Sequence, residues 1–217
     1  MSEADRKRWD ERHAEGGHRS VADPWMLEQL ADRKTGRLLD VAAGRGALAL
    51  KAAVMGFSVC AVDISRIALD DLEAEARHRG LAIETRTADL DDITALAGLA
   101  PFDLLTISRY KPTPLQWQNI APALKDGGHL LVCSFSDRQQ SMRPAFRLNR
   151  ECLKAELEPL GFSLKVWQDL ERDENFMAGS VWVKGELSWS REFRQRVKVY
   201  SSERDVRKNE QATPVHG

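Results

Sequence analysis

Strand-like apolar segments alternate with segments of helical periodicity over most of the chain. The strand-like segments that precede the last predicted helix are 37–41, 57–62, 81–87, 102–108 and 129–135. The segments predicted to be helical are 24–35, 47–54, 66–79, 93–99, 115–124 and 149–158. Regular alternation of this kind is typical of an α/β fold in which parallel strands are joined by helices. The pattern therefore predicts a doubly wound, mostly parallel sheet with helices on both of its faces.

Two further strand candidates, 162–168 and 179–187, follow the last predicted helix. The residues between them leave no room for a crossover helix, so the two strands most simply pair as an antiparallel hairpin. With this hairpin the sheet is expected to have seven strands.

The chain divides into three predicted parts. Residues 1–22 are expected to form an arm or lid that closes over something, since residues 1–20 are highly charged and interrupted by one large apolar residue, Trp9. Residues 23–190 are expected to form one Rossmann-like domain, since 217 residues suit a single α/β core. Residues 191–217 are predominantly basic with few apolar side chains, which predicts a partly disordered tail.

The most informative motif lies where the first strand meets the next helix. The strand ends in an acid, Asp40, and is followed by a tight turn with Gly44 and Gly46 before a helix begins near Ala47. The second strand also ends in an acid, Asp63. This arrangement is typical of a nucleotide-binding βαβ unit, with a loop that lets a ligand approach the backbone and a carboxylate placed for ribose hydroxyls.

In a doubly wound sheet the ligand crevice lies beyond the carboxyl ends of the strands. Besides the two acids above, Asp89 and Ser108 follow strands and are expected at the same edge. Ile64 could lie against a purine ring, and Asp89 could accept a hydrogen bond from an exocyclic amino group. Asp89 also belongs to an acidic patch with Asp91 and Asp92 that could simply begin a helix.

The order of these features resembles the class I S-adenosylmethionine-dependent methyltransferases. The segments that carry the resemblance are Leu39–Gly46, Val62–Ser65, Ala88–Leu90, Phe102–Leu105 and Leu124–Leu131, within residues 37–135. The N-terminal Trp9–Arg12 also resembles the arm of the branch that includes tellurite-resistance-type methyltransferases.

The resemblance implies S-adenosyl-L-methionine as cofactor and S-adenosyl-L-homocysteine as product. The methionine amino group would be held by Asp40 and by the backbone of the loop, the ribose by Asp63, and the adenine by Asp89 and the side chains beside it. The residues assigned to the cofactor are Trp9, Arg12, Asp40, Ala42, Gly44, Gly46, Asp63, Ile64, Asp89, Leu90 and Ser108. Ala42 departs from the family pattern, which most often has glycine there. Trp9 and Arg12 could instead only anchor the arm.

Methyl transfer needs chiefly that donor and acceptor are aligned and that water is excluded, which is consistent with the lack of an obvious catalytic pair. Arg109 and Tyr110 follow the fourth strand and are the candidates for orienting a small-molecule acceptor. The segment 138–150 contains four arginines and no acid, so it could attract an anionic acceptor or could be ordinary solvated surface. These arginines are Arg138, Arg143, Arg147 and Arg150.

Two other functional classes stay open at this point. The segment Gly44–Ala49 also fits a dinucleotide-binding pattern, which would suit a nicotinamide-dependent oxidoreductase, although the charge of Asp40 disfavours a diphosphate nearby. A ligand-binding or RNA-associated protein is favoured by the basic tail and by the arginine-rich segment 138–150, and is disfavoured by the net charge of −1. No apolar run is long enough for a signal peptide or a membrane span, so a cytoplasmic protein is expected. The three cysteines are far apart and His13 and His18 have no acidic or sulfur partner, so no metal site is expected.

Overall fold

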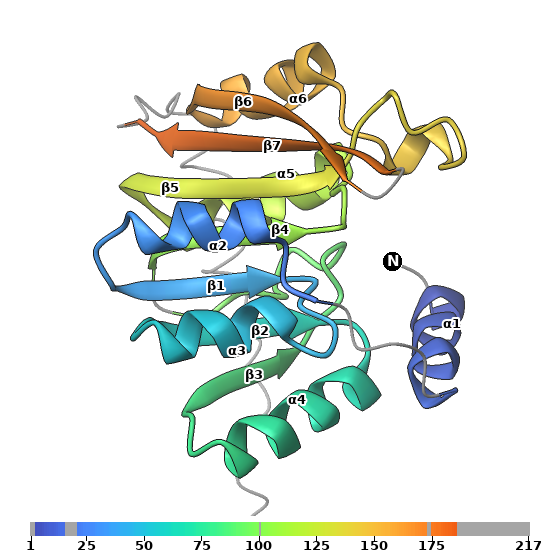
Figure 1. Ribbon diagram of the computed structural model, residues 1–217, viewed down its shortest axis with the longest axis vertical. Helices are drawn as coiled ribbons and strands as arrows, with labels where there is room; N and C mark the ends of the chain where they lie inside the picture. Colours follow the sequence, from blue (N-terminus) through green and yellow to red (C-terminus); the bar gives the residue numbers. More distant parts are fainter. Residues whose placement is uncertain (1–2, 16–20, 100, 173–174, 186–217) are drawn as a thin grey trace, which may run out of the picture. The chain divides into compact units, whose positions relative to one another are not determined.

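The computed structural model describes residues 3–15, 21–99, 101–172 and 175–185. A seven-stranded sheet of order β3-β2-β1-β4-β5-β7-β6 forms its centre (Figure 1). The strands are β1 (Arg37–Val41), β2 (Ser58–Asp63), β3 (Ile83–Thr87), β4 (Phe102–Ser108), β5 (Leu124–Phe135), β6 (Phe162–Arg172) and β7 (Asn175–Lys184). The α-helices are α1 (Glu3–Ala14), α2 (Pro24–Ala31), α3 (Ala47–Val54), α4 (Arg66–His78), α5 (Pro114–Ile120) and α6 (Arg150–Leu157).

The strand pairing confirms the predicted doubly wound sheet. Strands β1 to β5 pair in parallel, whereas β7 runs antiparallel to both β5 and β6. The predicted C-terminal hairpin is therefore correct, with longer strands than expected, and its second strand lies inside the sheet rather than at the edge.

Alternate side chains of the strands build two apolar cores, one on each face of the sheet. Leu38 of β1 packs into the core beneath α2, α3 and α4, which lie on one face in Figure 1. Its neighbour Leu39 points the opposite way, into a core that includes Trp117 of α5 and Leu153 of α6. Because successive strand residues face opposite sides, one short apolar strand serves both layers.

Two helix starts have the caps that the sequence indicates. The Asp23 carboxylate accepts a hydrogen bond from the Trp25 amide at 2.8 Å, with Pro24 in the first turn of α2. Ser65 Oγ accepts from the Ala68 amide at 3.2 Å and begins α4. These side chains satisfy amides that have no partner within the helix, so the helix starts are set locally.

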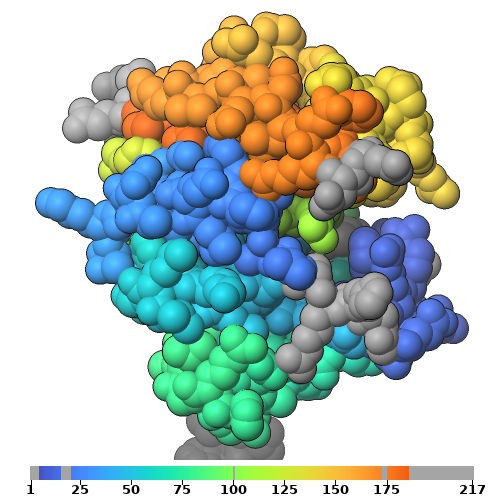
Figure 2. Space-filling view, viewed as in Figure 1, coloured from blue at the N-terminus to red at the C-terminus, as the bar shows by residue number. Residues whose placement is uncertain are grey.

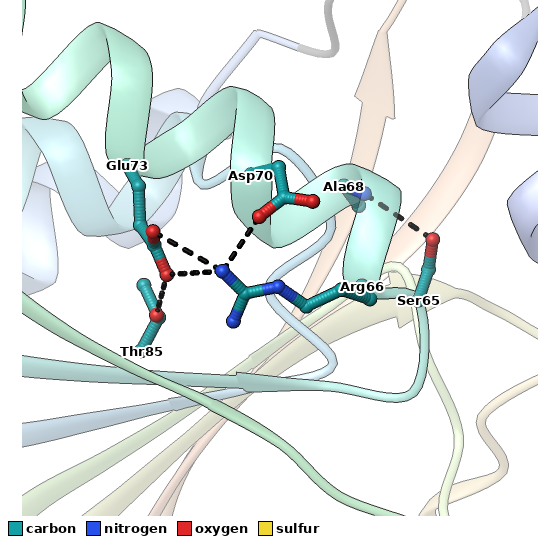
Figure 3. A network of polar contacts seen from close by, with 6 residues as sticks. All are labelled: Ser65, Arg66, Ala68, Asp70, Glu73 and Thr85. Atoms are coloured by element: carbon teal, nitrogen blue, oxygen red, sulfur yellow. Dashed lines mark hydrogen bonds and ion pairs between the residues drawn. The ribbon is translucent and has the colours of Figure 1, made fainter.

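Figure 3 shows how the first turns of α4 are fixed over β3. Arg66 bridges two acids of α4, with its Nη2 2.6 Å from Asp70 Oδ1 and 3.1 Å from Glu73 Oε1. Glu73 in turn accepts a hydrogen bond from Thr85 of β3. The Arg66 pairs are exposed and contribute little stability, so the network chiefly orients the helix end that follows Asp63.

One predicted helix is absent, and the helices expected over 24–35 and 115–124 end early, at Ala31 and Ile120. Residues 93–99 form successive turns instead of a helix. The Asp92 carboxylate there accepts from both the amide and the hydroxyl of Thr94, and such side-chain bonds compete with helical ones. The helix expected over 115–124 ends at Ile120, and β5 already begins at Leu124. Its pairing with β4 shifts register between Phe102 and Leu104, so the glycine turn expected at 125–128 lies within the strand as an irregularity.

The predicted terminal parts are only partly covered by the structure. Within the arm 1–22, residues 3–14 form α1, and the predicted tail at 191–217 lies outside the described residues. The α-helices in the described ranges are each too short or too polar to cross a membrane.

Replacing Asp23 tests the cap that holds α2. The carboxylate is 5% exposed and also accepts a hydrogen bond from Arg172 Nη1 at 2.9 Å. We expect Asp23→Ala to lower the free energy of unfolding by about 1–2 kcal/mol, the usual effect of losing an N-cap. Denaturant unfolding measures the change, and Asp23→Asn, which still caps, should lose less. The exposed Asp32→Ala is the control, and an equal loss in both alanine variants would contradict the capping role.

Candidate active site

The predicted site residues lie at or just after the carboxyl ends of β1, β2, β3 and β4, apart from Trp9 and Arg12, which lie in α1. The loops that follow these strands lie at one edge of the sheet, and α1 lies beyond the same edge (Figure 1). In the space-filling view, α1 stands out as a ridge at this edge (Figure 2). A doubly wound sheet binds its ligand at this edge.

The loop between β1 and α3 has an unusual backbone. Ala42, Gly44 and Gly46 all have positive φ angles, of 55°, 54° and 70°. A Cβ on Gly46 would lie 2.6 Å from Leu72 Cδ2, so no side chain fits there. At Gly44 the nearest atom to such a Cβ would be His13 Cε1 at 3.9 Å, which leaves the backbone open toward α1. The loop is thus tightly packed on the side of Leu72, and its backbone at Gly44 is open on the side of α1.

Ala42 stands where the family most often has glycine, and its backbone conformation costs free energy. Glycine adopts a positive φ freely, whereas an alanine pays about 1 kcal/mol or more for the left-handed conformation. The structure explains the expected glycine at this position: the turn requires a positive φ that Ala42 also adopts.

Asp63 at the end of β2 is bonded to two loops at once. Its Oδ2 accepts from the Gly44 amide and its Oδ1 from the Ser65 amide, both at 2.8 Å. Burial raises the pKa of Asp63, while these two backbone bonds and the nearby His13 act in the opposite direction. Each carboxylate oxygen has a second lone pair, so both can still accept a hydrogen bond from a ligand. Its ribose-binding role stays a prediction.

Asp40 lies deeper than the sequence indicated, at 2% exposure. One carboxylate oxygen accepts from Thr106 Oγ1 at 2.8 Å, and the Ala49 backbone of α3 also bonds to the group. Burial raises the pKa of Asp40 to about 7, against the effect of these bonds. The acid therefore holds the start of α3 and the β4 strand together, and contact with a methionine amino group stays a prediction.

The residues expected around adenine follow β2 and β3. Ile64 and Leu90 are buried apolar side chains, and the Leu90 carbonyl accepts from Asn119 Nδ2 at 2.9 Å. The Asp89 carboxylate accepts from the Asp91 amide at 2.9 Å, which closes a turn instead of beginning a helix. Their contacts with a purine stay predictions.

Beyond β4, Ser108 is half-buried and Arg109 is exposed with a φ of 55°. Its amide donates to the Cys133 carbonyl at 2.8 Å, which ties the strained residue to β5. A non-glycine residue held in this conformation is uncommon and often marks a functional loop. The assignment of Arg109 to the acceptor stays a prediction.

Tyr110 belongs to a chain of hydrogen bonds that the sequence reasoning missed. Its hydroxyl donates to Gln116 Oε1 at 2.6 Å, and Gln116 Nε2 donates to Asp91 Oδ1 at 2.8 Å. Gln116 is 1% exposed and links the loop after β4 to the loop after β3. Burial raises the pKa of Tyr110 to about 12, helped by the charges of three acids, so the phenol stays protonated near neutral pH. The local signal for Gln116 was the capping pair that it forms with Thr113.

Helix α1 contacts the same loops. Ser65 Oγ donates to Asp10 Oδ1 at 2.5 Å, and Arg45 Nη2 donates to the His13 carbonyl at 2.6 Å. Trp9 is half-buried, whereas Arg12 is exposed and lies over the Trp9 ring at 5.3 Å. The structure thus turns His13 rather than Arg12 toward the loop, and cofactor contacts of Trp9 and Arg12 stay predictions.

The arginine-rich segment 138–150 follows β5. Arg138 pairs with Glu171 at 3.3 Å and lies 4.2 Å from the centre of the Phe176 ring. Arg147 Nη1 donates to the Asp137 carbonyl at 3.1 Å. Arg143 and Arg150 are exposed. Two of the four arginines therefore have neighbours that hold them in place, and recognition of an anionic acceptor stays a prediction.

The polar side chains that end β1 and β2 and follow β3 are carboxylates: Asp40, Asp63 and Asp89. Carboxylates suit a ribose diol and a cationic amino group, and they repel a diphosphate. Residues 38–128, which contain all three, match the methyltransferase domain family. The chain therefore contains a class I S-adenosylmethionine-dependent methyltransferase domain over these residues. This methyltransferase uses S-adenosylmethionine as its cofactor, which sets aside the nicotinamide-dependent alternative.

Solved structures share the fold at low sequence identity. One belongs to work on the conversion of a disulfide bond into a thioacetal group during echinomycin biosynthesis; it is 18% identical, with a TM-score of 0.69 over 91% of this chain and 99% of that one. Magnesium protoporphyrin IX methyltransferase from Synechocystis PCC 6803 with bound S-adenosylhomocysteine is 14% identical, with a TM-score of 0.67 over 84% and 98%. TehB from Haemophilus influenzae is 14% identical, with a TM-score of 0.63 over 81% and 67%. No curated protein matches this methyltransferase in sequence.

Glycine substitutions at Ala42 and at Ala53 are expected to change the free energy of unfolding in opposite directions. We expect Ala42→Gly to raise the free energy of unfolding by about 0.5–1 kcal/mol, because glycine removes the left-handed strain and returns only part of that gain as chain entropy. Ala53→Gly in α3 should lower it by about 0.5–1 kcal/mol. Thermal and denaturant unfolding measure both. Destabilisation by both variants would show that Ala42 is not strained.

Asp40 predicts a pH dependence of stability. Its folded pKa, about 7, lies above the ordinary value of 3.8, so the folded protein holds this proton more tightly than the unfolded chain. The contribution of this proton to the free energy of unfolding is complete below about pH 4. It is lost as the pH rises to about 7, by up to about 1.4 kcal/mol per pH unit. Unfolding measured across this range should show wild type losing stability relative to Asp40→Asn, which does not titrate. Parallel pH profiles of the two proteins would contradict this assignment.

Proposed function

We propose that this methyltransferase acts on a small-molecule acceptor by in-line displacement and that its residues serve mainly to position the two reactants. The observation that carries the proposal is the coverage of the loop 42–46 by α1, through the contacts Ser65–Asp10 and Arg45–His13. A site beneath a helix suits an acceptor that fits inside it, and the net charge of −1 gives no general attraction to nucleic acid. A macromolecular acceptor would need an open surface at this edge.

The residues that would hold the cofactor fit its chemistry. Asp63 would accept hydrogen bonds from the ribose hydroxyls, and the open backbone at Gly44 would face the methionine part. Ile64 and Leu90 would contribute apolar contacts to adenine. When bound, S-adenosylmethionine supplies a methyl group that a sulfonium already activates, so the chain has only to align the acceptor and exclude water.

On the acceptor side, Arg109 and Tyr110 would orient the incoming molecule. The high pKa of Tyr110 keeps the phenol protonated, with its hydrogen donated to Gln116, so the phenol is a poor base near neutral pH. The exposed Arg109 follows β4, and the arginines of 138–150 follow its neighbour β5, which favours an acceptor that carries negative charge. An acceptor that arrives ionised needs no general base.

The names of two similar structures support a small acceptor. One is called magnesium protoporphyrin IX methyltransferase, and another belongs to work on echinomycin biosynthesis. The fold recurs in 966 matching chains, so it does not by itself choose an acceptor. The proposal therefore depends on the site residues of this chain.

Asp63→Ala tests the cofactor site. We expect the variant to bind S-adenosylmethionine more weakly by about 1.5–3 kcal/mol, because hydrogen bonds to a charged group are lost. Isothermal titration calorimetry measures the affinity, and circular dichroism checks the fold. Asp126→Ala, at an exposed position in β5, is the matched control. Equal affinity of the Asp63 variant and wild type would refute the ribose assignment.

The acceptor class can be tested with methyl-labelled S-adenosylmethionine. The protein is incubated with a cell extract separated into a dialysable and a macromolecular fraction, and we expect label in the dialysable fraction. Arg109→Ala should lower transfer to an anionic acceptor by at least tenfold with little change in cofactor affinity. Label that enters only RNA or protein would overturn the proposal of a small acceptor.

A further inference from the structure

Helix α1 faces the domain with a mainly polar side. Asp5, Trp9, Asp10 and His13 are half-buried, while the other residues from 6 to 15 are exposed. The spacing of these four residues places them on one side of a helix. Burial of apolar area cannot position such a surface well, because Trp9 is its only large apolar side chain. Specific polar contacts must therefore determine where the helix lies.

Those contacts lead to the two segments that form the candidate cofactor site. Asp10 accepts from Ser65, two residues after Asp63, and the His13 carbonyl accepts from Arg45, which lies between the two loop glycines. Arg45 is held from below, with its Nε 2.9 Å from Asp71 Oδ2 of α4. The last turn of α1 is therefore fixed directly over the loop.

The His13 ring reaches the open side of that loop. Its Cε1 would lie 3.9 Å from a Cβ on Gly44, and among the residues that the structure describes no other heavy atom outside the chain neighbours of Gly44 would be within 4 Å. The charged groups that act on the imidazole are Asp63 at the end of β2, Arg45 of the loop, Asp71 of α4 and Arg12 of its own helix. The ring thus lies beside Gly44, whose amide is bonded to the Asp63 carboxylate, where the proposed function puts the ribose and methionine parts of the cofactor.

We propose that His13 is a cofactor-binding residue whose ring closes the site over the ribose and methionine parts. This inference rests on the assignment of Asp63 and Gly44 under the proposed function. The competing possibility, that the ring blocks the site and must leave before the cofactor binds, predicts the opposite effect of removing it.

The charge of the ring gives the inference a second readout. Burial lowers the pKa of His13, with Arg45 and Arg12 acting in the same direction and Asp63 and Asp71 opposing them. The imidazole is therefore neutral at neutral pH and offers no repulsion to a cation. S-adenosylmethionine carries a sulfonium that S-adenosylhomocysteine lacks, so a protonated His13 should disfavour the first more than the second.

The first test measures the affinity of both cofactor forms by calorimetry at neutral pH. We expect His13→Ala to weaken both about tenfold, because a contact with the bound ligand is lost. The matched control is His78→Ala, at the exposed end of α4, which should bind as wild type does. Tighter binding by His13→Ala would show that the ring blocks the site, and unchanged binding would show that it makes no contact. Either result overturns the inference.

The second test uses His13→Phe, which keeps a ring and removes the titration. In wild type, the ratio of S-adenosylmethionine to S-adenosylhomocysteine affinity should fall severalfold as the pH decreases through the pKa of His13, below the ordinary histidine range. Protonation of Asp40 and Asp63 also weakens cation binding at low pH, but it persists in the variant. The additional fall should be absent from His13→Phe, and identical pH profiles would contradict the role of the imidazole.

The two proposals can fail separately. If wild type binds neither form of the cofactor, or if Asp63→Ala binds both as tightly as wild type does, the proposed site is wrong. If Asp63→Ala loses affinity and His13→Ala does not, the proposed site stands and the inference about His13 is wrong.

Discussion

The two hydrogen bonds that Asp63 accepts, from Gly44 and from Ser65, organise this edge of the molecule. One bond holds the loop after β1, and the other holds the start of α4. The Asp63 carbonyl also accepts from Ala88, which follows β3, so three consecutive loops meet at one residue. A buried carboxylate is costly without such partners. The same bonds that offset this cost leave lone pairs free on both oxygens, and structural and binding roles therefore coexist in one side chain.

Features determined within a few residues could be predicted from the sequence. Asp23 and Ser65 cap helices through amides two or three positions away, and the parallel strands β1, β2 and β4 are mainly apolar segments with buried side chains on both faces. The turns at 93–99 could not be predicted in this way, because apolar residues there suggest a helix while the Asp92 side chain takes over a backbone donor. The early start of β5 at Leu124 depends on pairing with Phe102, a contact that local pattern does not reveal.

The same distinction separates the parts of the site. The glycine loop and the strand-end acids follow from spacing, but their partners do not. Asp40 was expected to face a ligand, yet Thr106 lies 66 positions away in the chain and takes one of its oxygens. Gln116 and His13 become visible only when loops distant in sequence come together. In α1, Arg12 carries the more prominent charge, and the helix phase gives the inward position to His13.

The position of β7 between β5 and β6 has a consequence for the order of assembly. β6 is made first, yet its neighbour in the sheet is the strand made after it. On a ribosome, β6 would therefore emerge with no strand to join, since the exposed edge of β5 is the place that β7 takes. Closing this half of the sheet must wait until residue 184 has been synthesised. Until then both edges offer unpaired backbone groups, and nascent chains would be most prone to association with one another at that stage.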